Sequence, residues 1–451
     1  MRIILPILCL VALAAPSAAS ASASLETGIA DDRTLNADPT VAGEWAAAGV
    51  DVVRIHARWS AIEPERGTFD WAALDRAVGA VRENGMRVTL AVTGPGAPWT
   101  SADPSRHDGR YKPVPASYGA FASAVAARYA PAVDRYLIWN EPNQPLWLTP
   151  QRYNGAPFAP HLYRDLVNAA TPAIHAADPG SEVVMGTLAP SGSDARSANA
   201  PVRPLAFLRA FACVDSRYRA VRTGRCAGFK APGADGFAIH PHGIRASPDT
   251  HARSRDDAPL ADLGRFESVL DRLTRARRLR VTTSTKYFRL FLTEFGYQTN
   301  PPDRYLGVST TQQAAWLARG AQRAYADPRV RNMTWYVWRD EPLGPSNASG
   351  WQSGMFFADR RPKPALAAFE LPFAASTSRV WGVVRPGAGH SVDIEARTAS
   401  GAYRRIRTLS TDARGGFSAT VKAPSWARYV RARVADEAAS GNLVSRGVHV
   451  R

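Results

Sequence analysis

The sequence has little cysteine, little lysine and almost no long apolar segment. Only three of its 451 residues are cysteine, and they do not have the paired spacing of a zinc finger. Lysine occurs five times against 51 arginines, and the formal net charge is +17. Beyond the N-terminal region no run of 18 apolar residues exists, so we expect no transmembrane segment. A G-x-G-x-x-G turn is also missing after the first predicted strand, which argues against a dinucleotide-binding fold.

The N-terminal residues have the pattern of a secretory signal peptide. Arg2 precedes the apolar stretch 3–15, and small residues follow it. We therefore expect residues 1–23 to be a signal peptide and the mature protein to be secreted and extracellular. In an oxidising compartment the two remaining cysteines, Cys213 and Cys226, are expected to form a disulfide, the alternative being two free buried thiols.

The basic charge would attract acidic polysaccharide, nucleic acid or anionic lipid. Its densest cluster, residues 275–280, ends a predicted helix and alternates arginine with apolar residues, which is typical of a solvated face. No nucleic-acid-binding motif accompanies it. We therefore expect no nucleic-acid partner.

Between residues 24 and 372 short apolar strands alternate with amphipathic helices. The eight predicted strands are Glu26–Ala30, Val52–Trp59, Arg87–Thr93, Tyr136–Asn140, Glu182–Leu188, Gly236–His240, Leu290–Phe295 and Met333–Trp338. Eight such strand–helix units predict an α/β protein with a (β/α)8 TIM barrel, which closes on itself and leaves no sheet edge. A doubly wound open sheet is the alternative.

The pattern changes in the last part of the chain. From Arg379 onward only strand-like runs occur, separated by Gly, Asp, Pro and Ser turns. Residues 379–451 are therefore predicted to form a small C-terminal all-β sandwich. No clear stripe of exposed aromatic residues marks this domain, so we interpret it as a structural cap on the barrel, with glycan binding as the alternative.

Two of the predicted barrel strands end in a carboxylate. The fourth runs into Trp-Asn-Glu-Pro at 139–142 and the seventh into Thr-Glu-Phe-Gly at 293–296. Because barrel enzymes place their chemistry at the C-terminal strand ends, Glu141 and Glu294 should face each other across the mouth. Such a pair suits glycoside hydrolysis, in which one carboxyl group protonates the leaving oxygen and the other attacks or stabilises the sugar. Taken singly, each residue could instead be a helix cap or an ion-pair partner.

These segments resemble the acid/base and nucleophile motifs of glycoside hydrolase clan A, which includes the family 5 cellulase-like enzymes and family 39. The run from Trp59 to Trp71 is also similar to that clan, and the resemblance covers about residues 25–372. It implies a retaining mechanism without a cofactor, with Glu141 as general acid/base and Glu294 as nucleophile.

The resemblance also implies that Asn140 hydrogen-bonds the sugar 2-hydroxyl and that Arg54 keeps the nucleophile ionised. Elementary electrostatics agrees, because a nucleophilic carboxylate needs a low pKa and a guanidinium lowers it. Arg54 shares one strand face with His56 and Arg58. A structural ion pair lower in the barrel is the alternative for Arg54.

The sixth strand ends in two histidines, His240 and His242. Relatives often have a histidine and then a tyrosine here, and the tyrosine hydrogen-bonds the nucleophile. His242 stands at the tyrosine position, which leaves the orienting role open, and a satisfied core histidine is the alternative for each. A metal site formed with Glu294 would require a demanding geometry, so we expect no metal.

Tryptophans on the loops are candidates for sugar binding. Trp338, at the end of the eighth strand, matches the position on which the sugar ring stacks in the clan. Trp99 and Trp147 follow the third and fourth strands and could line further subsites, as could Trp351. The alternatives are core packing for Trp338 and loop anchoring for the others.

The sequence therefore predicts a secreted, monomeric, retaining glycosidase that cleaves β-linked oligo- or polysaccharide, with an acidic polymer among the candidate substrates. Endo and exo action remain open. One alternative is a non-catalytic glycan-binding or cell-envelope protein on the same barrel, and another is a basic adhesin that acts through residues 379–451.

Overall fold

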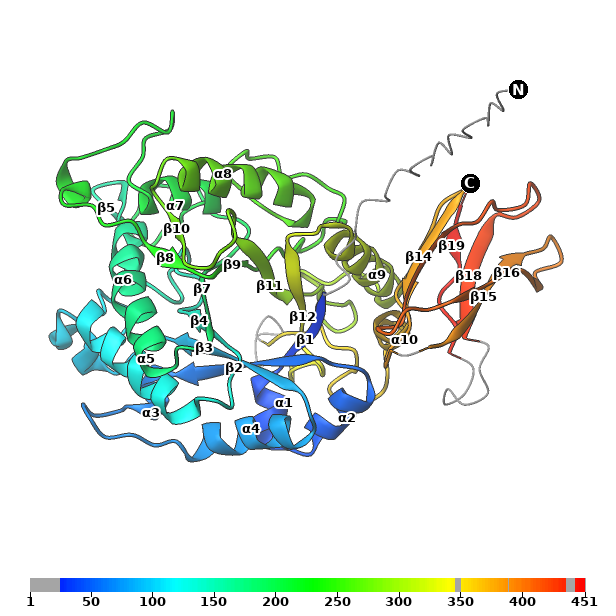
Figure 1. Cartoon of the computed structure of the whole chain (residues 1–451), viewed down its shortest axis with the longest axis horizontal. Helices are drawn as coiled ribbons and strands as arrows, with labels where there is room; N and C mark the ends of the chain where they lie inside the picture. Colours follow the sequence, from blue (N-terminus) through cyan, green and yellow to red (C-terminus); the bar gives the residue numbers. More distant parts are fainter. Residues whose placement is uncertain (1–24, 345–349, 388, 435–442, 451) are drawn as a thin grey trace, which may run out of the picture.

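The computed structural model describes residues 25–344, 350–387, 389–434 and 443–450 (Figure 1). The predicted signal peptide lies outside these residues. Within the described part of the chain, no helix is both long and apolar enough to cross a membrane. Figure 1 shows a large barrel that contains both helices and strands, with a smaller all-strand unit beside helices α9 and α10.

Eight parallel strands form a closed barrel in the order β1-β12-β11-β9-β7-β4-β3-β2. They are β1 (Glu26–Ala30), β2 (Val52–Arg58), β3 (Arg87–Thr93), β4 (Arg135–Ile138), β7 (Glu182–Leu188), β9 (Gly236–Ile239), β11 (Arg289–Phe295) and β12 (Val330–Tyr336). All eight expected strands are confirmed, and their ends differ from the predicted ones by a few residues. Most of these strands are buried on both faces, which explains their near-continuous apolar sequence.

Helices connect the strands and cover the barrel. Their bounds are α1 (Asp32–Ala37), α2 (Val41–Ala47), α3 (Trp59–Ile62), α4 (Ala72–Glu83), α5 (Pro115–Tyr129), α6 (Ala159–Ala177), α7 (Pro204–Phe211), α8 (Leu263–Arg275), α9 (Thr310–Ala326) and α10 (Pro364–Glu370). Helix α8 shows the principle, because its apolar residues recur at three- and four-residue spacing and are all buried. The sequence interpretation missed α1 and α2, which are only six and seven residues long.

Short elements complete the barrel domain. Two small ribbons pair β5 (Arg152–Tyr153) with β6 (Ala156–Pro157) and β8 (Gly233–Ala234) with β10 (Arg280–Val281). Four 3₁₀ turns are η1 (Pro98–Thr100), η2 (Pro104–Arg106), η3 (Gly224–Cys226) and η4 (Leu260–Asp262).

The barrel interior is packed in layers rather than open. Near the N-terminal strand ends, Arg135 lies 3.1 Å from Glu26 and 2.8 Å from Glu182, and all three side chains point inward. Above this ion pair lies an apolar layer from five strands: Ala91, Leu137, Val184, Ala238 and Phe291. The polar residues of the opposite, C-terminal ends therefore rest on a solid floor.

The loop after β2 is fixed by one buried carboxylate. The Trp59 indole donates a hydrogen bond to Glu63 Oε2 at 2.8 Å, and the Gly67 amide donates to Glu63 Oε1 at 2.9 Å. Gly67 has a φ of 76°, a conformation that favours glycine. The Trp59–Trp71 motif is thus held in shape by its own residues.

Residues after the barrel form a β-sandwich of two antiparallel sheets. One has the order β13 (Phe373–Ala375), β14 (Arg379–Val383), β17 (Gly416–Thr420), and the other β16 (Tyr403–Ser410), β15 (Ser391–Arg397), β18 (Tyr429–Val434), β19 (Val448–His449). Side chains of both sheets, such as Phe417 and Ile394, share one apolar core. The domain begins at β13, six residues before the expected start at Arg379.

The sandwich is fastened to the barrel at several points. Trp381 packs its ring 5.4 Å from that of Tyr325 on α9. Arg385 is buried and donates hydrogen bonds to Thr27 Oγ1 at 3.1 Å and to the Phe369 carbonyl. Thr27 lies near the start of β1, so this contact is at the barrel end opposite the C-terminal strand ends.

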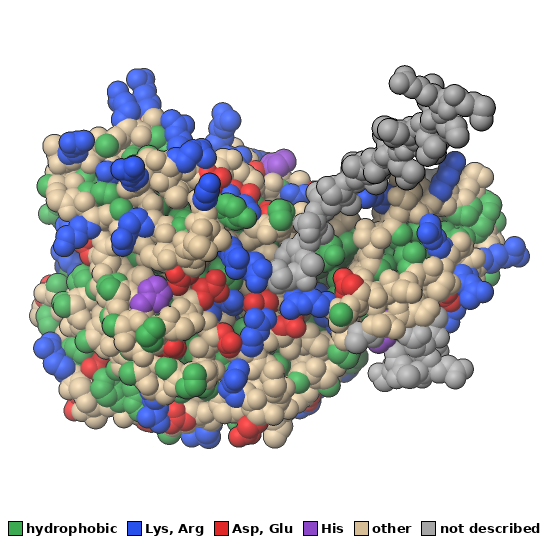
Figure 2. Space-filling view, viewed as in Figure 1, with side chains coloured by type: hydrophobic (Ala, Val, Ile, Leu, Met, Phe, Trp, Pro, Cys, Tyr) green, Lys and Arg blue, Asp and Glu red, His purple; other side chains and the backbone are tan. Residues whose placement is uncertain are grey.

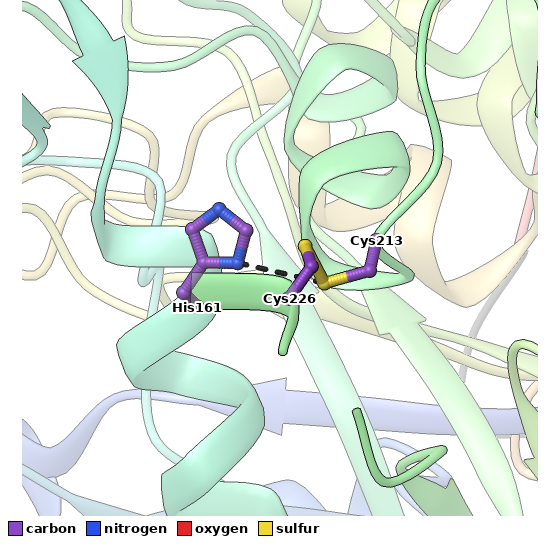
Figure 3. A group of neighbouring side chains, drawn as sticks. All are labelled: His161, Cys213 and Cys226. Carbon is purple, nitrogen blue, oxygen red and sulfur yellow. Dashed lines mark hydrogen bonds between the residues drawn. A yellow bond between two sulfur atoms is a disulfide. The ribbon is translucent and has the colours of Figure 1, made fainter. Parts of the chain in front are cut away.

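The expected disulfide between Cys213 and Cys226 is confirmed (Figure 3). It links the chain just after α7 to the 3₁₀ turn η3. Figure 3 shows His161 of α6 pointing at the bridge, with Nδ1 3.9 Å from Cys213 Sγ. Because both sulfur atoms are bonded to each other, this group offers no thiolate to a metal ion.

Candidate active site

A cleft of about 850 Å³ opens at the C-terminal ends of the barrel strands. Its walls carry more charged and aromatic residues than aliphatic ones. They comprise Asp31, Asp32, Arg33, Asn36, His56, Arg58, Asn140, Glu141, Leu146, Trp147, Glu294, Tyr336, Val337, Glu341 and Trp351. Both predicted catalytic carboxylates thus line one cavity, as the barrel topology requires, since β4 and β11 are three strands apart.

A sharp turn after β4 brings Glu141 into the cleft. Trp139 and Glu141 have positive φ values of 67° and 37°, which L residues seldom adopt. The Glu141 amide donates a hydrogen bond to the Thr187 carbonyl at 3.0 Å, which anchors the turn to β7. The Glu141 side chain keeps 19% of its surface exposed. Strained backbone of this kind persists where the surrounding structure fixes it, often at functional sites.

Glu294 is the buried member of the pair. It lies within β11, and Arg54 of β2 places Nη1 2.8 Å from Glu294 Oε1. Burial alone would raise the pKa of Glu294, but His240, Arg54 and His242 together hold it well below its usual value. Glu294 is therefore an ionised carboxylate at neutral pH.

His240, just after β9, lies between the two carboxylates. Its Nδ1 is 3.0 Å from Glu141 Oε1 and 3.6 Å from Glu294 Oε2. The two distances add up to 6.6 Å, which is the largest separation that these two oxygens can have. Retaining glycosidases place their carboxyl groups about 5–5.5 Å apart and inverting ones about 6.5–9.5 Å apart. The spacing falls on the retaining side.

His242 stands where relatives have a tyrosine. Its Nε2 lies 3.5 Å from Glu294 Oε2, and its ring stacks on Trp351 at 6.0 Å with an angle of 23° between planes. The structure therefore brings His242 to the nucleophile face, and both expected histidines reach the site.

His240, His242 and Glu294 could together hold a metal ion, since their ligand atoms lie within 4.8 Å of one another. Two contacts compete with that role. Glu294 already faces the Arg54 guanidinium at 2.8 Å, which repels a further cation, and the His240 Nδ1 atom is directed at Glu141. The arrangement suits a carboxylate pair better than a metal centre.

The expected substrate-binding residues divide between the cleft and other positions. Asn140 lies in the cleft, with Oδ1 3.4 Å from Arg54 Nη1. Trp147 lines the cleft as well, edge-on to His56 with ring centres 5.9 Å apart. Trp99 is not among the lining residues. It packs against Trp59 and donates a hydrogen bond to the Pro64 carbonyl at 3.1 Å.

The structure does not place Trp338 as a stacking platform. Its side chain is 3% exposed and packs against Phe356 and Phe369 in the hydrophobic core. Strand β12 ends at Tyr336, so Trp338 lies beyond the strand end and turns inward. The aromatic residues that face the cleft on this side are Tyr336 and Trp351.

Sequence reasoning did not select Tyr336 and His56 as site residues. Burial, with a further contribution from Glu294, raises the pKa of Tyr336 well above its usual value, so its hydroxyl stays protonated. His56 follows Arg54 by two residues on β2, and both its ring nitrogens lack a partner among the described residues. The period-two alternation on β2 is the signal that could have identified His56.

The barrel, with one carboxylate after β4 and another on β11, defines the class of protein. It is the architecture of clan A glycoside hydrolases, and the likeness expected from the motifs is confirmed. The family model described as beta-galactosidase matches residues 40–105, which include β2, β3 and the Glu63 loop.

Two solved structures show how far the fold likeness extends. A family 39 glycoside hydrolase from the gut symbiont Bacteroides cellulosilyticus WH2 has a TM-score of 0.54 and 16% identity, over 89% of this chain and 81% of that chain. A GH5_18 variant from Streptomyces cattleya, in complex with Manb1-4GlcNAc, has a TM-score of 0.50 and 16% identity, over 76% and 78%. At these identities the likeness establishes the fold. No curated protein matches the chain significantly.

Proposed function

We propose that the chain is a retaining β-glycoside hydrolase with Glu294 as nucleophile and Glu141 as general acid/base. The observation that carries the proposal is the pairing of the two carboxylates across His240, which limits their facing oxygens to 6.6 Å. The difference in their surroundings supports the assignment of roles. Glu294 is buried against a guanidinium, whereas Glu141 is partly exposed and contacts no arginine within the described residues.

In the first step Glu294 attacks the anomeric carbon of the sugar. The bond from that carbon to the glycosidic oxygen breaks, and Glu141 gives its proton to the departing oxygen. The product is an ester between Glu294 and the sugar. Arg54 lies against Glu294 Oε1 and Asn140 lies beside Arg54, so the amide is placed to bind the sugar hydroxyl next to the anomeric carbon.

In the second step Glu141, now a carboxylate, takes a proton from water. The oxygen of that water attacks the anomeric carbon, and Glu294 leaves as a carboxylate. Two inversions give net retention. Arg54 favours this departure because it stabilises the charge that returns to Glu294.

The cleft walls support a carbohydrate substrate. Trp147, Trp351 and Tyr336 line the cavity and offer flat apolar faces to sugar rings. We propose that the substrate is an oligo- or polysaccharide met outside the cell, in line with the N-terminal signal pattern.

The test is the release of reducing ends from β-glucans, mannans, xylans, galactans and acidic exopolysaccharides, together with aryl β-glycosides. Wild type should act on at least one of them, and Glu141→Ala and Glu294→Ala should lose that activity. Glu83→Ala, an exposed glutamate on α4, is the matched control and should retain it. Azide should rescue Glu294→Ala with an inverted glycosyl azide as product.

Two outcomes would contradict the proposal. A well-folded wild type that retains glycans but releases nothing from any substrate would indicate a binding protein on the barrel. An inverted product from the wild type, followed by NMR of the first anomer formed, would exclude the covalent route through Glu294.

A further inference from the structure

The C-terminal sandwich carries a disproportionate share of the positive charge. Residues 379–451 contain 13 basic and five acidic residues, a net +8, whereas the other 378 residues carry +9. Figure 2 shows several Lys and Arg side chains on the surface of this domain. Charge so concentrated on one small domain indicates an interaction with a polyanion rather than a requirement of the fold.

The outer face of the sheet β16-β15-β18-β19 organises part of this charge. On β15, Val392, Ile394 and Ala396 point into the sandwich core, so Asp393, Glu395 and Arg397 lie on the other face. The two acidic side chains on this face are 2% and 6% exposed. They are covered by arginines from the neighbouring strands.

Two arginines of β18 satisfy these carboxylates. Arg433 lies 2.9 Å from both Asp393 Oδ2 and Glu395 Oε1, and Arg431 lies 2.7 Å from Glu395 Oε2. The Thr408 hydroxyl donates to Asp393 Oδ1 at 2.7 Å. The acidic groups of the face are therefore engaged, and they cannot neutralise further arginines at short range.

Two more arginines on this face remain free to bind a ligand. Arg405 of β16 is 66% exposed, and its nearest carboxylate contact is a long 3.8 Å to Asp393. Arg397 is exposed and makes no ion pair among the described residues. Its guanidinium lies 5.7 Å from the centre of the Tyr429 ring.

Aromatic rings accompany these guanidinium groups across the sheet. Tyr403 pairs with Arg397, and Tyr429 pairs with His449 in the strand register. The Arg431 guanidinium lies 3.8 Å from the centre of the Tyr403 ring, and the rings of Tyr429 and His449 are 5.1 Å apart. Planar donors thus alternate with flat apolar rings along one row.

We propose that this outer face, formed by Arg397, Arg405, Tyr403 and Tyr429, binds an acidic polysaccharide through its carboxylate groups. Arginine forks match carboxylates in geometry, and tyrosine faces suit the apolar faces of sugar rings. The site is separate from the barrel cleft, so it would hold the enzyme on a charged glycan matrix whichever bond the barrel cleaves. The proposal goes beyond the hydrolytic function and does not depend on it.

The test is affinity electrophoresis of the full chain, migrating toward the cathode in gels that contain polygalacturonate or a neutral β-glucan. All proteins carry Glu294→Ala, so that retention does not depend on turnover. Polygalacturonate should retard the parent protein, and Arg397→Ser/Arg405→Ser should bind about tenfold or more weakly. The control is Arg253→Ser/Arg275→Ser, which removes equal charge from two exposed barrel arginines without ion pairs among the described residues and should bind as the parent does.

Three outcomes would overturn the proposal. Equal losses in the two double variants would mean that only net charge matters. Stronger binding to duplex DNA or to phosphatidylglycerol vesicles than to polygalacturonate would assign the face to another polyanion. No retardation by polygalacturonate at low salt would remove the site altogether. Thermal melts of both double variants confirm that each is folded.

Discussion

At the scale of single residues, Glu294 is defined by its neighbours rather than by its own sequence. Arg54 comes from β2, His240 and His242 follow β9, and all three lie within 3.6 Å of its oxygens. Their combined effect outweighs the desolvation that would otherwise raise the pKa of Glu294. A buried carboxylate is thereby kept ionised, which is the state that a nucleophile requires.

We expect Arg54→Met to move the acidic limb of the kcat/KM profile to higher pH. Arg54 lowers the pKa of Glu294, so its removal raises that pKa and more of the nucleophile is protonated at a given acidic pH. Breaking a buried pair should also cost about 3–5 kcal/mol of stability. The pH profile on an aryl glycoside and a thermal melt measure the two effects.

The matched control for this variant is Arg58→Met. Arg58 is on the same strand but is exposed and makes no ion pair with Glu294. Its substitution should leave the acidic limb in place. Equal shifts in both variants would show that Arg54 acts through general charge and not through its contact.

His56 should contribute to substrate binding as a neutral imidazole. Burial lowers the pKa of His56 to about 4, and both ring nitrogens are free to hydrogen-bond a sugar hydroxyl in the cleft. We expect His56→Ala to raise KM about 3- to 10-fold, with a smaller change in kcat. Steady-state kinetics between pH 5 and 8 measures this, and an unchanged KM would contradict it.

At the scale of elements, loops after the strands create the site, while other connections stabilise the barrel. The disulfide between Cys213 and Cys226 lies on the chain after α7, and neither residue lines the cleft. Its role should therefore be structural.

We expect Cys213→Ser/Cys226→Ser to lower the free energy of unfolding by ~3 kcal/mol, because the bridge closes a loop of 13 residues. Hydrolysis of an aryl glycoside at 25 °C should be unchanged. Chemical denaturation followed by circular dichroism, with and without reductant, measures the loss. A reductant effect of equal size in the double variant would show that the bridge is not its cause.

At the scale of the whole molecule, the sandwich and the barrel share buried contacts. Trp381 belongs to the main hydrophobic core, and burial lowers the pKa of Arg385 to about 10. The domain is therefore a cap, as expected from the sequence, and its outer sheet is left free for a ligand.

Arg385→Ala should destabilise the full chain by about 1–3 kcal/mol, since Thr27 and the Phe369 carbonyl lose a buried donor. Arg379→Ala, an exposed neighbour on β14, is the control and should change the melting temperature little. Differential scanning calorimetry measures both. An unaffected Arg385→Ala protein would mean that the domains do not depend on this contact.

The sequence by itself determined the eight barrel strands, because buried parallel strands read as apolar runs separated by amphipathic helices. It also selected Glu141 and Glu294, since barrel chemistry is confined to the strand ends. The pairing of Cys213 with Cys226 followed from the small number of cysteines.

Only the tertiary structure decided how these groups meet. Strand register places His240 between the two carboxylates, and closure of the barrel brings Arg54 beside Glu294. It also turned Trp338 into the core and left Tyr336 and Trp351 at the cleft, since β12 ends two residues earlier than expected. Local sequence fixes which residues reach a strand end, but side-chain direction beyond that end depends on packing between distant segments.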